Sequence, residues 1–188
     1  MNIIPSVIGL GYVGLPIFLK LQKKFKTIGF DNDNLRIINL NKKRDTNKEF
    51  TKKNLFLNKG SCFTSDFKKL KKSNFFIITV PTPVYKNNLP NLDYLKKSCL
   101  LISKVLKKRD IIFFESTVYP GVTEDFCAKI LEKNSKLKLE KDFFVGYSPE
   151  RINPGDKNHS VDKIYKVVST KNLSTMKIAK KVYSSITK

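Results

Sequence analysis

Three glycines near the start of the chain constrain the fold more than any other feature of the sequence. Gly9, Gly11 and Gly14 follow an apolar run at 3–8 and open an amphipathic stretch at about 14–24. In a strand–turn–helix unit the first such glycine permits a tight turn, the second allows close approach to the backbone, and the third lets the helix pack on the strand. The spacing therefore predicts a β-strand that turns directly into a helix.

Apolar runs and amphipathic stretches then alternate along the rest of the chain. Further strands are predicted at 27–31, 61–63, 75–80, 110–115, 142–147 and 163–169. Helices are predicted at 34–40, 92–106, 123–131 and 174–185, with a helical turn at 66–70 and a loop containing a weak helix at 41–60. Strands that alternate with helices favour a parallel sheet covered on both faces. We expect a Rossmann-type, doubly wound, mainly parallel sheet in three α/β/α layers.

An acidic residue follows the glycines at the distance that a dinucleotide-binding unit requires. Asp31 ends the next predicted strand, 20 residues after Gly11. A carboxylate there accepts hydrogen bonds from a ribose 2′-OH and repels a 2′-phosphate, while the N-terminus of the first helix attracts a pyrophosphate. Asp31 could instead cap the helix at 34–40. With strand, glycines and acid in register, we predict a dinucleotide site that prefers NAD to NADP.

Polar motifs follow three other predicted strands, at 81–83 (Pro-Thr-Pro), 116–121 (Ser-Thr-Val-Tyr-Pro-Gly) and 148–151 (Ser-Pro-Glu-Arg). Ligands of an open parallel sheet bind outside the carboxyl ends of the strands, so we expect these segments to gather beside the glycine loop. Each segment alone also fits an ordinary turn or cap. Glu150 could hold a water or act as a general base, or it could simply pair with Arg151.

Lysine dominates the charge of the chain, which has 37 Lys and Arg residues against 16 Asp and Glu and a formal net charge of +21. A chain this basic can bind nucleic acid, anionic lipid or an acidic substrate. The lysines are spread along the sequence, with no arginine cluster, zinc-finger spacing or RNP-type aromatic motif. These features favour a charge that helps to attract a phosphorylated substrate over one that binds nucleic acid.

Neither a metal centre nor a membrane segment is expected. His159 is the only histidine and has no metal-ligand companions, and Cys62, Cys99 and Cys127 are scattered as in structural thiols of a reducing compartment. No apolar stretch reaches the ~18–20 residues that span a bilayer. The N-terminal run has no basic leader, so we expect a cytoplasmic protein.

Five longer motifs occur in a fixed order along the chain. They are GLGYVGLP, IGFDND with Arg36 shortly after it, ITVPTP, ESTVYPG and VGYSPERINPGDK. In that order, over about 3–169, the chain resembles the UDP-glucose/GDP-mannose dehydrogenase family, and its later motifs are most similar to the branch that acts on UDP-N-acetylglucosamine and UDP-N-acetylgalactosamine. The resemblance implies oxidation of the sugar C6 from alcohol to acid in two hydride transfers to NAD, with a cysteine that traps the intermediate aldehyde.

The resemblance also implies a role for each residue that matches a family motif. Thr117 and Glu150 are the implied catalytic residues, which position water near the reacting carbon. The implied substrate-binding residues are Glu150, Arg151, Ile152 and Asn153. The implied cofactor-binding residues are Gly9, Gly11, Tyr12, Val13, Gly14, Asp31, Arg36, Pro81, Thr82 and Thr117. Within this set, Asp31 and Arg36 would hold the adenosine ribose, and Thr82 and Thr117 would flank the nicotinamide.

The chain departs from the family in length and in its cysteines. Family members are more than twice as long, and their nucleophilic cysteine and catalytic lysine and asparagine lie in later segments; the three cysteines here match no nucleophile position. Pro154 stands where some branches carry a second acid, and Thr170 and Lys171 stand where a glycine is usual. We expect 1–188 to be one NAD-binding domain, with a soft boundary near 155–160, that lacks the central helical and C-terminal domains.

Such a chain would be a truncated or split UDP-N-acetylhexosamine 6-dehydrogenase, inactive alone and completed by a second chain that carries the missing half. Two alternatives stay open at this point. One is a dinucleotide-binding module without catalysis, and the other is a basic nucleic-acid-associated protein on the same fold.

Overall fold

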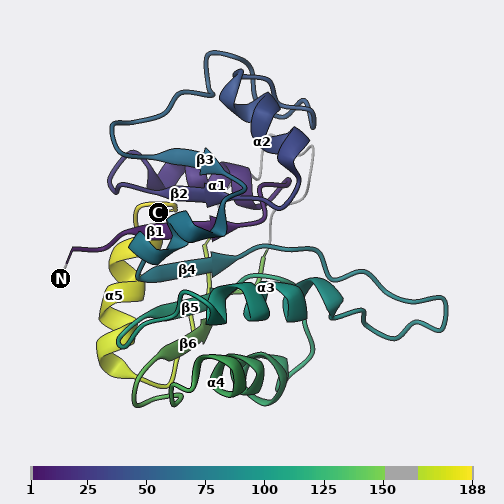
Figure 1. Ribbon diagram of the computed structural model, residues 1–188, viewed down its shortest axis with the longest axis vertical. Coiled ribbons are helices and arrows are strands. Elements are labelled where there is room, and N and C mark those ends of the chain that lie inside the picture. Colours follow the sequence, from purple (N-terminus) through teal and green to yellow (C-terminus); the bar gives the residue numbers. More distant parts are fainter. Residues whose placement is uncertain (1, 151–164, 188) are drawn as a thin grey trace.

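A single parallel sheet forms the centre of the molecule in the computed structural model, which describes residues 2–150 and 165–187 (Figure 1). Within these residues six strands lie in the order β3-β2-β1-β4-β5-β6, and every neighbouring pair is parallel. The strands are β1 (Pro5–Ile8), β2 (Ile28–Phe30), β3 (Cys62–Thr64), β4 (Phe75–Ile78), β5 (Ile111–Phe114) and β6 (Phe144–Tyr147). The chain reverses its direction of winding between β1 and β4, which is where ligands of such sheets bind. The predicted fold class is confirmed.

Helical segments connect the strands and cover both faces of the sheet (Figure 1). They are α1 (Gly14–Leu21), α2 (Asn34–Asn41), the 3₁₀ helix η1 (Phe67–Lys72), α3 (Asp93–Ser103), the π-helical η2 (Val122–Ala128), α4 (Lys129–Ser135) and α5 (Leu173–Tyr183). Side chains cap several of them: Asp33 accepts from the first backbone N–H groups of α2, and Asn172 does the same for α5. These caps satisfy donors that a helix start leaves without partners.

Two hydrophobic cores lie on opposite faces of the sheet because successive strand residues point in opposite directions. On one face Phe75 and Ile77 pack with α1 and α5. On the other face Phe76 and Ile78 pack with α3, η2 and α4. All four of these β4 side chains are fully buried, so this central strand is apolar throughout rather than alternating, as expected for a sheet covered on both faces.

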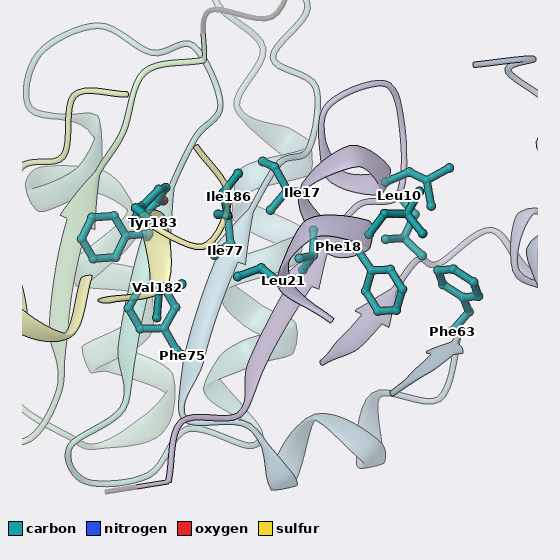
Figure 2. Packing of buried hydrophobic residues seen from close by; sticks show 14 of the residues in the cluster. Leu10, Ile17, Phe18, Leu21, Phe63, Phe75, Ile77, Val182, Tyr183 and Ile186 are labelled. Atoms are coloured by element: carbon teal, nitrogen blue, oxygen red, sulfur yellow. The ribbon is translucent and has the colours of Figure 1, made fainter. Parts of the chain in front are cut away.

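Helix α5 closes the first of these cores through an aromatic group. The rings of Phe75 and Phe113 stack with centroids 5.4 Å apart, and Tyr183 of α5 meets Phe113 edge-on at 5.3 Å. Figure 2 shows Tyr183 and Val182 directed from α5 toward Phe75 and the sheet. Gly146 of β6 makes this packing possible, because a Cβ there would lie 2.3 Å from Cζ of Phe113.

Three predicted elements differ in kind from the observed ones, and the boundaries of the others agree to within three residues. After Asn41, the last residue of α2, no helix forms in the predicted loop 41–60. Asp45 accepts the backbone N–H groups of Asn47, Glu49 and Phe50 and so replaces helical hydrogen bonds. The strand predicted at 163–169 is, among its described residues, a single antiparallel bridge to Tyr147. The helix predicted at 123–131 starts one residue earlier with the π-helical η2 and continues as α4 to Ser135. The predicted boundary near 155–160 lies outside the described residues.

The contact between Gly146 and Phe113 can be tested by overpacking. We expect Gly146→Ala to lower the free energy of unfolding by about 1–3 kcal/mol, because the new methyl group must displace a ring that is held on its other sides. Chemical denaturation would measure this. Adding Phe113→Leu should cost less in the Gly146→Ala background than in the native one; strictly additive costs would contradict the assigned contact.

Candidate functional site

The glycine loop after β1 is held in place by backbone contacts that only glycine permits. Gly9 has φ of +95° and donates its N–H to the carbonyl of Phe30 at 2.8 Å. A Cβ on Gly14 would lie 1.8 Å from the carbonyl oxygen of Gly9 and 2.5 Å from Oγ1 of Thr79. The Thr79 hydroxyl also hydrogen-bonds the Gly9 carbonyl at 2.8 Å. The start of α1 is therefore fixed against both β1 and the end of β4.

Gly11, unlike Gly14, has open space around it. It is exposed, and a Cβ built there would meet no atom within 4 Å. The neighbouring Tyr12 is also exposed and Val13 is half-buried. The backbone of the loop is thus open at the N-terminus of α1, where free N–H groups and the helix dipole favour a phosphate group.

Asp31 joins the glycine loop to the end of β2. Its Oδ2 accepts the N–H of Leu10 at 2.7 Å, and its Oδ1 accepts the N–H of Asp33 at 3.0 Å. The alternative in which Asp31 caps α2 is wrong, since Asp33 accepts from Leu35 and Arg36 at the start of that helix. Each carboxylate oxygen of Asp31 keeps a further lone pair, so it can still accept from a sugar hydroxyl.

Arg36 lies beneath the same loop and is 7% exposed. Its Nε donates to the carbonyl of Leu10 at 2.9 Å, and its Nη1 donates to Asp45 at 2.6 Å and to Thr46 at 2.9 Å. Its Nη2 is buried without a hydrogen-bond partner among the described residues. An unmet donor of this kind costs about 1–3 kcal/mol or more, which a polar ligand atom would offset. Sequence reasoning found Arg36 but missed Asp45, whose only signal was an acid within a polar loop.

Two hydrogen bonds join the loops that follow β4 and β5. The hydroxyl of Ser116 donates to the carbonyl of Val80 at 2.5 Å, and the hydroxyl of Thr82 donates to the carbonyl of Thr117 at 2.7 Å. Pro81 and Thr117 are exposed on this edge. The structure therefore places Thr82 and Thr117 together at the carboxyl edge of the sheet, as the motif positions predicted.

Glu150, three residues after β6, belongs to a buried group of charges. Lys166 Nζ lies 2.5 Å from Glu115 Oε2 and 3.0 Å from Glu150 Oε2, and these side chains are 2%, 0% and 10% exposed. Burial raises the pKa of Glu115 to about 7 although Lys166 lowers it. Glu115 and Lys166 were not singled out from the sequence, because their pairing joins segments 51 residues apart. Arg151, Ile152 and Asn153 lie outside the described residues.

The cysteines are placed away from this edge. Cys62 begins β3, at the amino end of that strand. Cys99 and Cys127 are fully buried between α3 and η2, where a mutual hydrogen bond and burial raise the pKa of the Cys99 thiol. In the described part of the chain, no group of three or more His, Cys, Asp or Glu side chains could hold a metal ion. None of the described helices is long and apolar enough to cross a membrane.

Comparison with known proteins identifies the family to which this arrangement belongs. The model of the UDP-glucose/GDP-mannose dehydrogenase family, NAD binding domain, matches residues 1–187. The chain belongs to the UDP-glucose/GDP-mannose dehydrogenase family. Within that family it corresponds to the NAD-binding domain, so the predicted family and cofactor are confirmed.

Relatives in the family share the sequence and the fold. Protein CapL of Staphylococcus aureus is 48% identical over 99% of this chain and 44% of its own length. UDP-N-acetyl-D-glucosamine 6-dehydrogenase of Pseudomonas aeruginosa is 45% identical over 96% of this chain and 43% of its own. The structure of a UDP-D-ManNAc dehydrogenase from Pyrococcus horikoshii superposes with a TM-score of 0.88 at 28% identity, over 99% of this chain and 45% of that one. The chain thus spans less than half the length of these relatives.

The residues of the glycine loop fit the cofactor that the family binds. Gly11 leaves the backbone open where a pyrophosphate would approach. Asp31 has free lone pairs for a ribose hydroxyl. Arg36 donates through Nε to the carbonyl of Leu10 in the loop, and its Nη2 has no hydrogen-bond partner among the described residues. When bound, NAD would act as the hydride acceptor, and the residues of the chain would bind and orient it.

Gly14 and Gly11 should respond differently to the same substitution. Gly14→Ala meets a backbone carbonyl that cannot move aside, so we expect a loss of about 3 kcal/mol or more in the free energy of unfolding. Gly11→Ala should change stability by no more than about 0.5 kcal/mol and yet weaken NAD binding about tenfold or more. Denaturation and calorimetry measure the two effects; full NAD affinity in Gly11→Ala would exclude this loop as the phosphate site.

Proposed function

We propose that this chain is the NAD-binding half of a UDP-N-acetylhexosamine 6-dehydrogenase, which oxidises the C6 alcohol of the sugar to the acid. The proposal is supported by 45% identity to a UDP-N-acetyl-D-glucosamine 6-dehydrogenase across nearly the whole chain. The geometry of the glycine loop and Asp31 agrees with it. The single observation that carries the NAD-binding part of the proposal is the Asp31 carboxylate, which accepts the N–H of Leu10 and remains able to accept a ribose hydroxyl.

Thr117 and Glu150 are the proposed catalytic residues at the carboxyl edge. Thr117 follows β5 with an exposed side chain, and its backbone carbonyl is fixed by the hydroxyl of Thr82. Glu150 follows β6 with its carboxylate on Lys166. A hydroxyl and a carboxylate on adjacent loops can orient a water molecule, and the carboxylate can accept its proton. Pro81 and Thr82 would contact the nicotinamide side of the cofactor, and Arg151–Asn153 the sugar nucleotide.

The trap for the intermediate aldehyde is proposed to come from outside these 188 residues. An attacking thiol must be accessible and able to ionise. Cys99 and Cys127 are fully buried, and Cys62 lies at the amino end of its strand. We therefore treat residues 1–188 as one NAD-binding domain whose catalytic complement, a central helical and a C-terminal domain, is carried by the remainder of the enzyme or by a second chain.

The proposed cofactor site is tested by titrating the chain with NAD and with NADP in a calorimeter at moderate salt. We expect saturable binding that prefers NAD. Asp31→Asn should weaken NAD binding about 10- to 100-fold, because a hydrogen bond to a charged group contributes about 1.5–3 kcal/mol, and it should reduce the discrimination against NADP.

Asp33→Asn is the matched control, because Asn also caps helices and Asp33 is exposed two residues away; its NAD affinity should stay within about twofold of the native value. Equal binding of NAD and NADP that weakens steeply with salt would contradict the proposal, since it would indicate a general polyanion surface on a chain of net charge +21.

A further inference from the structure

A buried polar cluster lies directly behind Glu150 and joins four parts of the fold. Glu115 follows β5, Ser148 follows β6, and Tyr183 is on α5. Lys166 comes from the segment that returns to the sheet edge, where Ser169 and Tyr147 exchange two backbone hydrogen bonds of 2.9 Å. Glu115, Ser148 and Tyr183 are each at most 3% exposed. Water therefore cannot solvate most of this cluster.

Glu115 shares its only oppositely charged partner among the described residues with a second carboxylate. One ammonium, that of Lys166, faces two carboxylates, those of Glu115 and Glu150. Tyr183 adds no charge near neutral pH, since burial and the Glu115 carboxylate raise the pKa of its hydroxyl. These are the titratable groups that face Glu115 from the described residues around it. A fully buried carboxylate that shares its cation with a second carboxylate favours uptake of a proton at that site.

Three polar atoms of the cluster also lack hydrogen-bond partners among the described residues: Oε1 of Glu115, Oγ of Ser148 and the hydroxyl of Tyr183. The Tyr183 hydroxyl lies beside both Glu115 and Ser148 without meeting either in good geometry. A protonated Glu115 would present one O–H donor, which the hydroxyl of Ser148 or of Tyr183 can accept. Unmet buried groups of this kind call for an explanation, and a proton on Oε1 provides one.

We propose that Glu115 is a proton-binding site and that Lys166 is a positioning residue for Glu150. With Glu115 protonated, Lys166 pairs with Glu150 and holds that side chain at the carboxyl edge; with Glu115 ionised, the two carboxylates compete for Lys166. The role assigned to Glu150 rests on the proposed function, whereas the proton site itself does not. Of the two acids Glu115 takes the proton, because its side chain is 0% exposed and that of Glu150 is 10% exposed.

The proton site is tested by following the glutamate carboxyl carbons of the ¹³C-labelled chain by NMR across pH, without cofactor or sugar. Glu115→Gln identifies the Glu115 signal. In the native chain we expect that signal to titrate near 7. Lys166→Met should raise its midpoint, since the lysine favours the ionised form, and Glu150→Gln should lower it, since the neighbouring charge disfavours that form. Lys166→Arg keeps the cation and should restore a midpoint close to the native one.

Lys129→Met, which removes an exposed lysine paired with the exposed Asp125, is the control and should leave the midpoint unchanged. If Lys166→Met does not fold, the lowered midpoint of Glu150→Gln and the near-native midpoint of Lys166→Arg still test the proposal. A native Glu115 that titrates near the ordinary value of 4.5, or one that is insensitive to Glu150→Gln, would overturn the proposal.

Stability gives a second readout. Because the folded pKa of Glu115 is raised above its unfolded value, the native state binds more protons between about 4.5 and about 7, so the free energy of unfolding should fall as pH rises through that window. Glu115→Gln should remove most of that slope. NAD calorimetry on the same samples separates the two proposals: titration near 7 without NAD binding would refute the proposed function alone, and NAD binding without the titration would refute the proton site alone.

Discussion

The close approach of Gly14 to the carbonyl of Gly9 is the constraint on which the rest of the site depends. It brings the first turn of α1 against the end of β1, and the Thr79 hydroxyl from the end of β4 completes the same contact. The two strands that meet at the reversal of the sheet are thus locked together at their carboxyl ends. Any bulk at this point would move the helix N-terminus, which is the part of the fold that attracts a phosphate.

Buried polar groups fix the geometry around that point. Arg36, which is paired with Asp45, holds the glycine loop through the carbonyl of Leu10, and Asp31 holds it through the N–H of Leu10. Lys166 holds the loop after β6 through its ion pair with Glu150. Buried ion pairs of this kind add little net stability, because the cost of desolvating the charges offsets their attraction. What they add is a link between distant segments, because Arg36 donates both to Leu10 and to Asp45, and Lys166 donates both to Glu115 and to Glu150.

The carboxyl edge of the sheet works as a single unit for a similar reason. The loops after β4 and β5 are joined by hydrogen bonds from Ser116 and Thr82, and the loop after β6 is joined to β5 through Glu115, Lys166 and Glu150. Helix α5 supports this arrangement from one face through Tyr183. The loops at this edge are thus fixed to one another as well as to their own strands.

The sequence by itself determined the order of the elements, the family and the position of the cofactor loop. These rest on local features, namely apolar runs that must be buried and glycines whose φ or lack of a side chain is required, and local features can be read directly from neighbouring residues. Only the tertiary structure decided that Asp33 rather than Asp31 caps α2, that Asp45 prevents a helix in 41–60, and that Glu115 shares Lys166 with Glu150. Each of these outcomes depends on which distant polar groups become buried together. Burial raises the free-energy cost of an unpaired charge, and no repeating pattern in the sequence shows which partner a buried charge will have.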